Sequence, residues 1–290
     1  MEDINALATR FPALAAKLPE LRELTTEMRR TILRMTNKAG AGHVGGSLSE
    51  LEILTALYFS VMNIDPKNPQ WPDRDRFILS KGHASPGFYT VLATRGYFPL
   101  SLLDTFDNCD SKLQAHPDMH KCPGVDFSTG SLGQGVSVGL GMAMAAEKQK
   151  KDFTVFVLIG DGEAQEGQVW EALMYAAANW VKRIVFIFDA NNVQLASINA
   201  AGTDADALVR KLEGFDMVTL DADGHALDKL IPALEEAVQI SKEGPVALVA
   251  RTTKGKGISF MEGTFQWHGK APNDKELALA LGELENGENQ

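Results

Sequence analysis

Two strongly apolar segments, each ending in small and polar residues, constrain the fold of this chain more than any other feature. The first runs from Phe153 to Ile159 and stops at Gly160-Asp161-Gly162, and the second runs from Arg183 to Phe188 and stops at Asp189-Ala190-Asn191-Asn192. Such segments are typical of parallel strands that are buried on both faces. Residues from about Gly167 to Trp180 suit a connecting helix. The sequence therefore predicts a βαβ unit within an α/β fold.

Further segments extend this pattern along the chain. Residues 1 to about 38 are predicted to form an N-terminal helical extension, because leucines recur there at helical spacing. Ser47 or Ser49 is expected to cap the helix that starts at Leu51, with Ser47 and Glu50 forming a capping box. Residues from about 279 to 290 are expected to form a polar tail. We predict further strands at Arg76–Ser80, Met217–Leu220 and Val246–Ala250, and helices within Leu51–Val61, Gly130–Lys148 and Leu227–Ile240.

The expected architecture is one domain over residues 1–290, with a mostly parallel central sheet and helices on both faces. A chain of 290 residues with 44% hydrophobic content is long enough to bury such a core. Its net charge of -10 argues against nucleic-acid binding, and no apolar run approaches the roughly 20 residues that span a bilayer. Cys109 and Cys122 lack metal-ligand spacing, and the acidic start of the chain does not resemble a signal peptide. We therefore expect two free thiols in a cytoplasmic protein.

The polar residues after the two buried segments suggest a binding site for a metal and a diphosphate. Because parallel strands place ligands at their carboxyl ends, Asp161 and Asn191 are expected to lie close together and to offer oxygen ligands to Mg²⁺. The neighbouring glycines allow close backbone approach to a phosphate, and the helix that starts near Gly167 points its N-terminus at the site. Asp189 is an alternative ligand, although we expect it to support the turn. The alternative for the whole motif is an ordinary tight turn.

Seven motifs, taken in order, give the chain a specific resemblance. The motifs are Gly42-His43, Ser80-Lys81-Gly82-His83-Ala84, His116-Pro117, Thr129-Gly130-Ser131-Leu132-Gly133-Gln134-Gly135, Gly160-Asp161-Gly162 followed by Glu163-Ala164-Gln165-Glu166-Gly167 and then Asp189-Ala190-Asn191, Thr252-Thr253-Lys254-Gly255-Lys256-Gly257, and Trp267-His268-Gly269-Lys270. Their order over roughly residues 20 to 275 resembles that of transketolases, which are thiamine diphosphate enzymes.

The resemblance implies a role for each matching residue. Asp161, Asn191 and the carbonyl of Val193 would hold Mg²⁺, for which Ca²⁺ or Mn²⁺ substitutes. The groups expected to act on substrate or on protons are His43, His83, His116, His268 and Glu166. The residues expected to bind thiamine diphosphate are His83, Gly130, Leu132, Gly160, Asp161, Gly162, Glu166, Asn191, Lys254 and His268.

Several residues near these motifs keep more than one interpretation. Lys81 and Lys254 suit anion contacts, with a surface position as the alternative. Gln194 lies near the place of a glutamine in some relatives, in a register that the sequence does not settle, so it is given no role. Gly46 stands where relatives often carry a polar residue. His120 and His225 are expected to be solvated loop histidines.

The resemblance also implies a partner. A full transketolase continues into pyrimidine-binding and C-terminal domains, so this chain resembles the N-terminal subunit of a split enzyme. We expect an α2β2 heterotetramer with a C-terminal subunit, moving a two-carbon ketol unit from a ketose phosphate to an aldose. The alternatives are a deoxyxylulose phosphate synthase-like or 2-oxo-acid dehydrogenase-like subunit, which the Ser80 and Trp267 motifs disfavour. From another class, a regulatory subunit that holds cofactor without catalysis is also considered. A sulfonated sugar substrate is left open.

Overall fold

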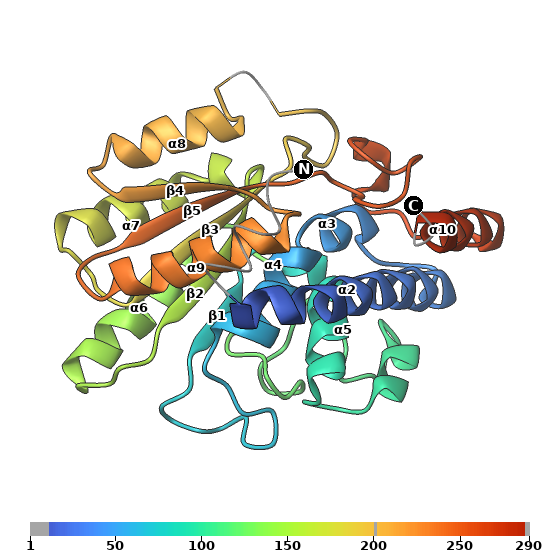
Figure 1. Ribbon diagram of the computed structural model, residues 1–290, viewed down its shortest axis with the longest axis horizontal. Helices are drawn as coiled ribbons and strands as arrows, with labels where there is room; N and C mark the ends of the chain where they lie inside the picture. Colours follow the sequence, from blue (N-terminus) through green and yellow to red (C-terminus); the bar gives the residue numbers. More distant parts are fainter. Residues whose placement is uncertain (1–11, 200–201, 288–290) are drawn as a thin grey trace.

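The computed structural model describes residues 12–199 and 202–287, and its centre is one parallel sheet. The sheet has five strands in the order β1-β2-β3-β5-β4, and every neighbouring pair is parallel (Figure 1). The predicted parallel α/β sheet is therefore confirmed. The strands are β1 (Arg76–Leu79), β2 (Val155–Gly160), β3 (Ile184–Ala190), β4 (Val218–Asp223) and β5 (Val246–Arg251).

Helices cover both faces of this sheet, as predicted. Alternate strand residues enter two separate cores, so that Val157 packs into one and Leu158 into the other. The first face is covered by α6 (Gln134–Lys148), α7 (Gly167–Ala178) and α8 (Ala205–Glu213). The second face is covered by α9 (Leu227–Ser241) and α4 (Leu51–Ala56), with α2 (Pro12–Ala39) packed beyond them.

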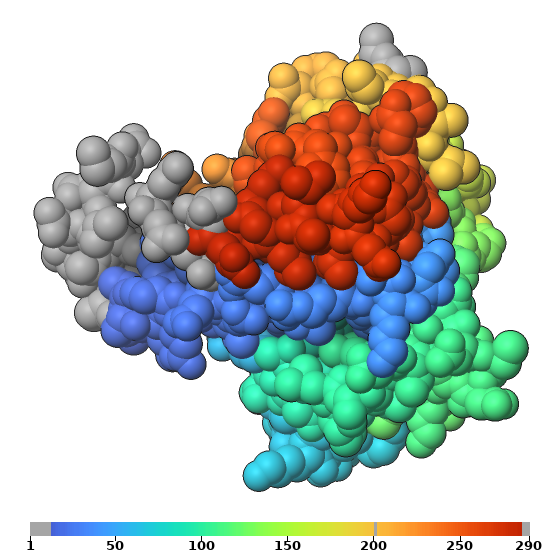
Figure 2. All heavy atoms as spheres, turned by 90° about the vertical axis from the view of Figure 1, so that its right-hand side faces the viewer, coloured from blue at the N-terminus to red at the C-terminus, as the bar shows by residue number. Residues whose placement is uncertain are grey.

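Most of the remaining elements surround the second core, whereas the Glu163–Gln165 turn packs Ala164 into the first. These remaining elements are α3 (Val44–Ser49), a π-helical turn (Leu57–Val61), α5 (Ser85–Arg95), α10 (Asp274–Gly287), and short 3-10 turns at Gly82–Ala84, Leu100–Thr105, Glu163–Gln165 and Phe265–Trp267. Figure 2 shows the C-terminal segment lying along the blue N-terminal helix, in agreement with the contacts between α10 and α2.

Two local predictions are wrong. Ser47 and Ser49 do not cap α4, because both lie inside α3 and give their hydroxyl protons to other acceptors. The prediction of a polar tail from about residue 279 is also wrong as far as Gly287, because α10 extends to that residue and packs Leu284 against the core. The helical N-terminal extension is confirmed from Pro12 to Ala39, and the remainder of that prediction lies outside the described residues. Within residues 12–199 and 202–287, no helix combines the length and apolar character needed to cross a membrane.

The two cysteines provide a simple test of the core packing. Cys109 is exposed, whereas Cys122 is buried and burial raises the pKa of its thiol to about 12. Since the thiolate is the nucleophile, iodoacetamide at pH 8 should modify Cys109 within minutes and leave Cys122 unmodified. Mass spectrometry of the digested protein measures both sites, and labelling in urea is the control in which both should react. Equal labelling without urea would contradict the buried position of Cys122.

Candidate functional site

A polar pocket lies at the carboxyl ends of β1, β2 and β3, where the sequence predicted a ligand. The strand register places Gly160 beside Asp189, so the residues that follow β2 and β3 meet at one edge of the sheet. The pocket is lined by all the predicted metal and cofactor residues and by every predicted catalytic residue except His116. Its lining residues are His43, Gly46, Lys81, His83, Gly130, Leu132, Gly160, Asp161, Gly162, Glu163, Gln165, Glu166, Asn191, Val193, Gln194, Leu195, Lys254 and His268.

His116 and Glu166 occupy the margin of this pocket. The ring of His116 is so close to Gly130 that a Cβ atom on that glycine would lie 3.2 Å from it. His116 is nevertheless exposed and does not line the pocket itself. Glu166 lines the pocket and is also exposed, so its carboxylate is accessible from outside this chain.

The oxygen atoms predicted to bind a metal lie in one turn after β3 and one after β2. Asp161 Oδ1 accepts a hydrogen bond of 2.7 Å from the backbone N–H of Gly162, and Oδ2 accepts from that of Asn192. Asn191 Oδ1 lies 3.1 Å from the backbone nitrogen of Val193, whose carbonyl accepts from Lys254 Nζ at 2.9 Å. Burial, and then the charge of Asp189, raise the pKa of Asp161 to about 6. One buried carboxylate, one amide oxygen and one carbonyl oxygen fit a hard divalent cation, which would offset that buried charge.

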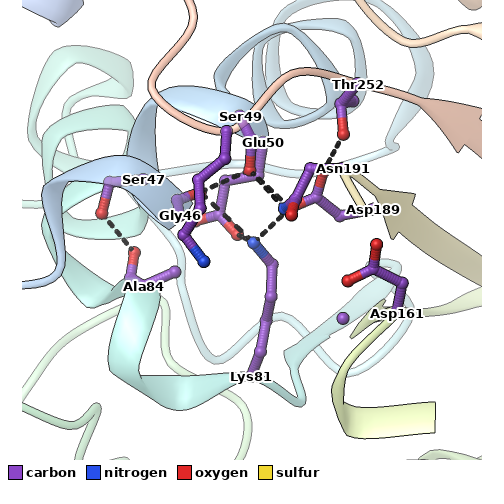
Figure 3. Close-up of polar contacts among 12 residues, drawn as sticks. Gly46, Ser47, Ser49, Glu50, Lys81, Ala84, Asp161, Asp189, Asn191 and Thr252 are labelled. Carbon is purple, nitrogen blue, oxygen red and sulfur yellow. Dashed lines mark hydrogen bonds and ion pairs between the residues drawn. The ribbon is translucent and has the colours of Figure 1, made fainter. Parts of the chain in front are cut away.

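Asp189 supports this turn through four side-chain donors, as Figure 3 shows. Its Oδ2 accepts from Lys81 Nζ and Ser49 Oγ at 2.6 Å each and from Asn191 Nδ2 at 3.2 Å, while Oδ1 accepts from Thr252. These bonds fix which way the Asn191 amide faces, because its nitrogen is held by Asp189 and its oxygen is left on the opposite side. Asp189 therefore supports the turn, as the sequence analysis expected.

Lys81 is buried rather than on the surface, and it lies between two acids. Its Nζ is 2.6 Å from Asp189 Oδ2 and 2.8 Å from Glu50 Oε2. Burial alone would lower the pKa of Lys81, but the two carboxylates outweigh burial and raise it. Burial would likewise raise the pKa of Asp189, and Lys81 outweighs it and lowers that pKa. For Glu50, burial dominates and raises the pKa to about 8. The stable ion pair is therefore Lys81 with Asp189.

Three histidines form a cluster within the same pocket. The ring centroid of His83 lies 4.9 Å from that of His43 and 5.0 Å from that of His268. Burial and then Lys254 lower the pKa of His268 to about 3, and burial followed by Lys81 lowers the pKa of His83 well below its usual value. Burial also lowers the pKa of His43. The three rings are therefore neutral near pH 7 and are able both to donate and to accept hydrogen bonds.

Lys254 connects this cluster to the metal oxygens. Its Nζ is 2.7 Å from His268 Nδ1, in addition to its bond to the Val193 carbonyl. Burial and then Lys81 lower the pKa of Lys254 to about 8, so it is mostly protonated at neutral pH and donates to His268 Nδ1. The remaining proton of His268 consequently lies on Nε2. A cationic amine beside three oxygen atoms and a histidine cluster is suited to an anionic ligand.

A comparison with known families agrees with this geometry. The model of the family described as "Transketolase, thiamine diphosphate binding domain" matches residues 22–285. The chain belongs to the transketolase family. The predicted resemblance, the fold and the enzyme class are thereby confirmed.

Relatives within the transketolase family include short subunits as well as full-length enzymes. The chain is 42% identical to one of the apulose-4-phosphate transketolase subunits of Actinobacillus succinogenes, over 91% of this chain and 96% of that protein. It is 40% identical to the 6-deoxy-6-sulfo-D-fructose transketolase subunit of a Clostridium species, over 92% of this chain and 96% of that protein. The crystal structure of Campylobacter jejuni transketolase superposes with a TM-score of 0.81 and 30% identity, covering 91% of this chain and 42% of the other.

Two residues that were given no site role from the sequence are connected to the pocket loops in the structure. His225, expected to be solvated, is instead half-buried: its Nδ1 lies 2.9 Å from Glu52, and its Nε2 accepts from the backbone N–H of Thr253 at 2.8 Å. His225 thus holds the backbone of Thr253, which directly precedes Lys254, in place. Glu163 lies within the diphosphate motif but was given no role from the sequence, and the structure buries it at the Gly160 turn. The expectation for His120 is confirmed, since this residue is exposed.

Proposed function

We propose that this chain is the subunit of a two-polypeptide transketolase that holds thiamine diphosphate and Mg²⁺. The enzyme would transfer a two-carbon ketol unit from a ketose phosphate to an aldose, together with a C-terminal subunit in an α2β2 heterotetramer. The observation that carries this proposal is a single pocket containing three metal-type oxygens, two buried lysines and three neutral histidines. Two relatives of nearly the same length whose names include the word subunit support the partner.

The pocket residues suggest how the two parts of the cofactor are held. Asp161, Asn191 and the Val193 carbonyl would hold the metal, and Ca²⁺ or Mn²⁺ could replace Mg²⁺ there. Lys254 and the backbone of the Gly160 turn would meet the diphosphate. The remaining cofactor contacts are proposed for Gly162, His83, His268, Glu166 and, through their backbone groups at the aminopyrimidine, Gly130 and Leu132.

The histidines and Glu166 are proposed to manage protons. Bound thiamine diphosphate supplies a nucleophilic carbon that accepts the two-carbon unit. His43 and His268, being neutral, would exchange protons with sugar hydroxyls, with His83 beside them. His116 would line the entrance to this channel, next to Gly130. Glu166, exposed at the pocket margin, would relay protons toward a second site across the subunit interface.

An anionic sugar is the proposed substrate class. The names of two relatives specify apulose-4-phosphate and 6-deoxy-6-sulfo-D-fructose, both of which carry an anionic group. Ordinary pentose phosphates and a sulfonated ketose are therefore the substrates to compare. We also propose a cytoplasmic location, for which two free thiols are the support.

The decisive experiment is reconstitution. The purified chain should show no ketol transfer alone, and transfer should begin when a subunit containing the pyrimidine-binding domain is added with thiamine diphosphate and Mg²⁺. The assay couples aldehyde product to a nicotinamide dehydrogenase and is read at 340 nm, with each candidate donor tested separately. Adding EDTA to the apoprotein mixture should abolish turnover, and excess Mg²⁺ should restore it. Full transfer by this chain alone would refute the need for a partner.

A further inference from the structure

Glu163 is a buried acid whose two oxygens both face backbone or hydroxyl donors of the pocket loops. It is 3% exposed and begins the short turn that follows Gly160-Asp161-Gly162. Its Oε1 accepts from Ser80 Oγ at 2.5 Å and from the backbone N–H of Gly133 at 2.7 Å. Its Oε2 accepts from the backbone N–H of Gly160 at 3.0 Å. One carboxylate therefore joins three segments that are far apart in the sequence.

Each of these three segments carries residues of the pocket. Ser80 immediately precedes Lys81 at the end of β1, Gly133 directly follows Leu132, and Gly160 precedes Asp161. The segment before α6 depends on the bond to Glu163 in particular, because Gly133 has a φ of +81° and lies in no strand that could hold its N–H. Hydrogen bonds to a carboxylate are roughly twice as strong as those between neutral groups. Glu163 is thus placed to fix the spacing of the loops that would surround a ligand.

We propose that Glu163 is a positioning residue that holds these three loops in register for the metal and the diphosphate. The identity of the ligand rests on the function proposed above, whereas the loop contacts are independent of it. The oxygens of Glu163 are occupied by protein donors, so it would act through the Gly160 turn and the Leu132 loop. Supporting groups of this kind typically contribute 10–100-fold to metal affinity.

The first test is hydrogen exchange on the chain alone, comparing the wild type with Glu163→Gln. The amide cannot replace the carboxylate, because its NH₂ group must face either the N–H of Gly160 or that of Gly133. At least one loop therefore loses its bond in either orientation. We expect about tenfold faster exchange in peptides covering 130–134 or 159–163. Peptides from β3 should exchange as in the wild type, which separates a local loosening from global destabilisation.

The second test is cofactor affinity in the reconstituted complex. Calorimetric titration with thiamine diphosphate at saturating Mg²⁺ should give a dissociation constant at least about tenfold higher for Glu163→Gln. The kcat at saturating cofactor should stay within about twofold of the wild type, while the KM for cofactor rises. A residue with only a general structural role would change kcat and cofactor affinity together, lowering both, or would change neither.

Two further variants complete the design. Glu147→Gln changes an exposed acid on α6 and should alter neither exchange nor affinity. Ser80→Ala removes only one of the three donors, so it should cause a smaller change in the same direction and keeps the test available if Glu163→Gln does not fold. Unchanged exchange in both loop peptides of Glu163→Gln would overturn the proposal. If the wild type fails to bind thiamine diphosphate, the proposed function fails, and hydrogen exchange still decides the role of Glu163.

Discussion

Replacing Lys81 with methionine should lower the free energy of unfolding by about 3–5 kcal/mol, because breaking a buried ion pair leaves an uncompensated charge. Lys81 is 3% exposed, and its Nζ lies within 3 Å of Asp189 and of Glu50. Methionine has a similar length and removes the one positive charge that contacts Asp189 among the described residues. The Asp189 carboxylate would keep its neutral donors but would be buried without a counter-charge. Urea denaturation followed by circular dichroism measures the loss.

A surface pair in the same chain is the matched control. Lys182 lies 3.3 Å from Glu243, and both side chains are largely solvent-accessible, at 43% and 86%. Lys182→Met should therefore change the free energy of unfolding by less than about 1 kcal/mol. The double variant Lys81→Met with Asp189→Asn should lose less than the sum of the two single losses, since the buried charge has then been removed. Similar small losses for Lys81→Met and Lys182→Met would show that the buried pair is not essential.

The contacts of Lys81 with Asp189 also explain why the candidate metal ligand Asn191 is held in one orientation. Asp189 receives donors from α3, from the end of β1 and from the end of β5, so the turn after β3 is fixed from three directions. A turn held this firmly needs little rearrangement when a cation arrives, which favours binding. Stability and the proposed metal site therefore depend on the same buried contacts.

The central sheet could be predicted from the sequence because its strands carry a strong local signal. The segments around Val157 and Phe186 are apolar on both faces, and only a strand covered on both sides buries such a segment. The strand order was not accessible, since the placement of β5 between β3 and β4 depends on contacts across the whole chain. Helix α8 was missed although Asp204 caps it through the N–H of Ala207, a signal that the sequence does contain.

The two wrong local predictions have different causes. Serine is a common helix-capping residue, but the hydroxyl of Ser49 donates to Asp189, which is 140 residues away. That competition is tertiary, so local sequence could not reveal it. The prediction of a polar tail was wrong because it followed the charged residues there. Leu277, Leu281 and Leu284 recur at helical spacing and pack toward the core. In that case the signal was present in the pattern.

The composition of the pocket was predicted largely through motifs, whereas its supporting residues were not. Asp161, Asn191 and the pocket histidines belong to short segments with a recognisable order, and the structure brings them together. Glu163 acts through Gly133, which is 30 residues away in sequence, and His225 acts through Thr253, which is 28 residues away. Glu163 lies inside a motif, but neither its contact with Gly133 nor that of His225 with Thr253 could be inferred from periodicity or spacing. Supporting groups of this kind are visible only when the folded contacts are known.

Replacing His268 with alanine should lower the kcat of the reconstituted enzyme by about 10²–10⁴-fold, the usual contribution of a general acid or base. Its Nδ1 accepts a hydrogen bond from Lys254, so the proton on Nε2 is the one available to a sugar hydroxyl. Because burial and Lys254 hold its pKa at about 3, His268 stays neutral from pH 5 to pH 9 and its own titration should not shape the activity profile there. Stopped assays at several donor concentrations separate kcat from KM.

An exposed histidine in the same chain supplies the control for this variant. His120→Ala should leave kcat unchanged, since that residue lies on a loop and outside the pocket. The dissociation constant for thiamine diphosphate should change less than about tenfold in His268→Ala, because Lys254 keeps its bond to the Val193 carbonyl. A large loss of kcat with nearly normal cofactor binding would place the ring in the chemical steps. Unchanged kcat would instead contradict a catalytic role for His268 and favour a subunit that only holds cofactor.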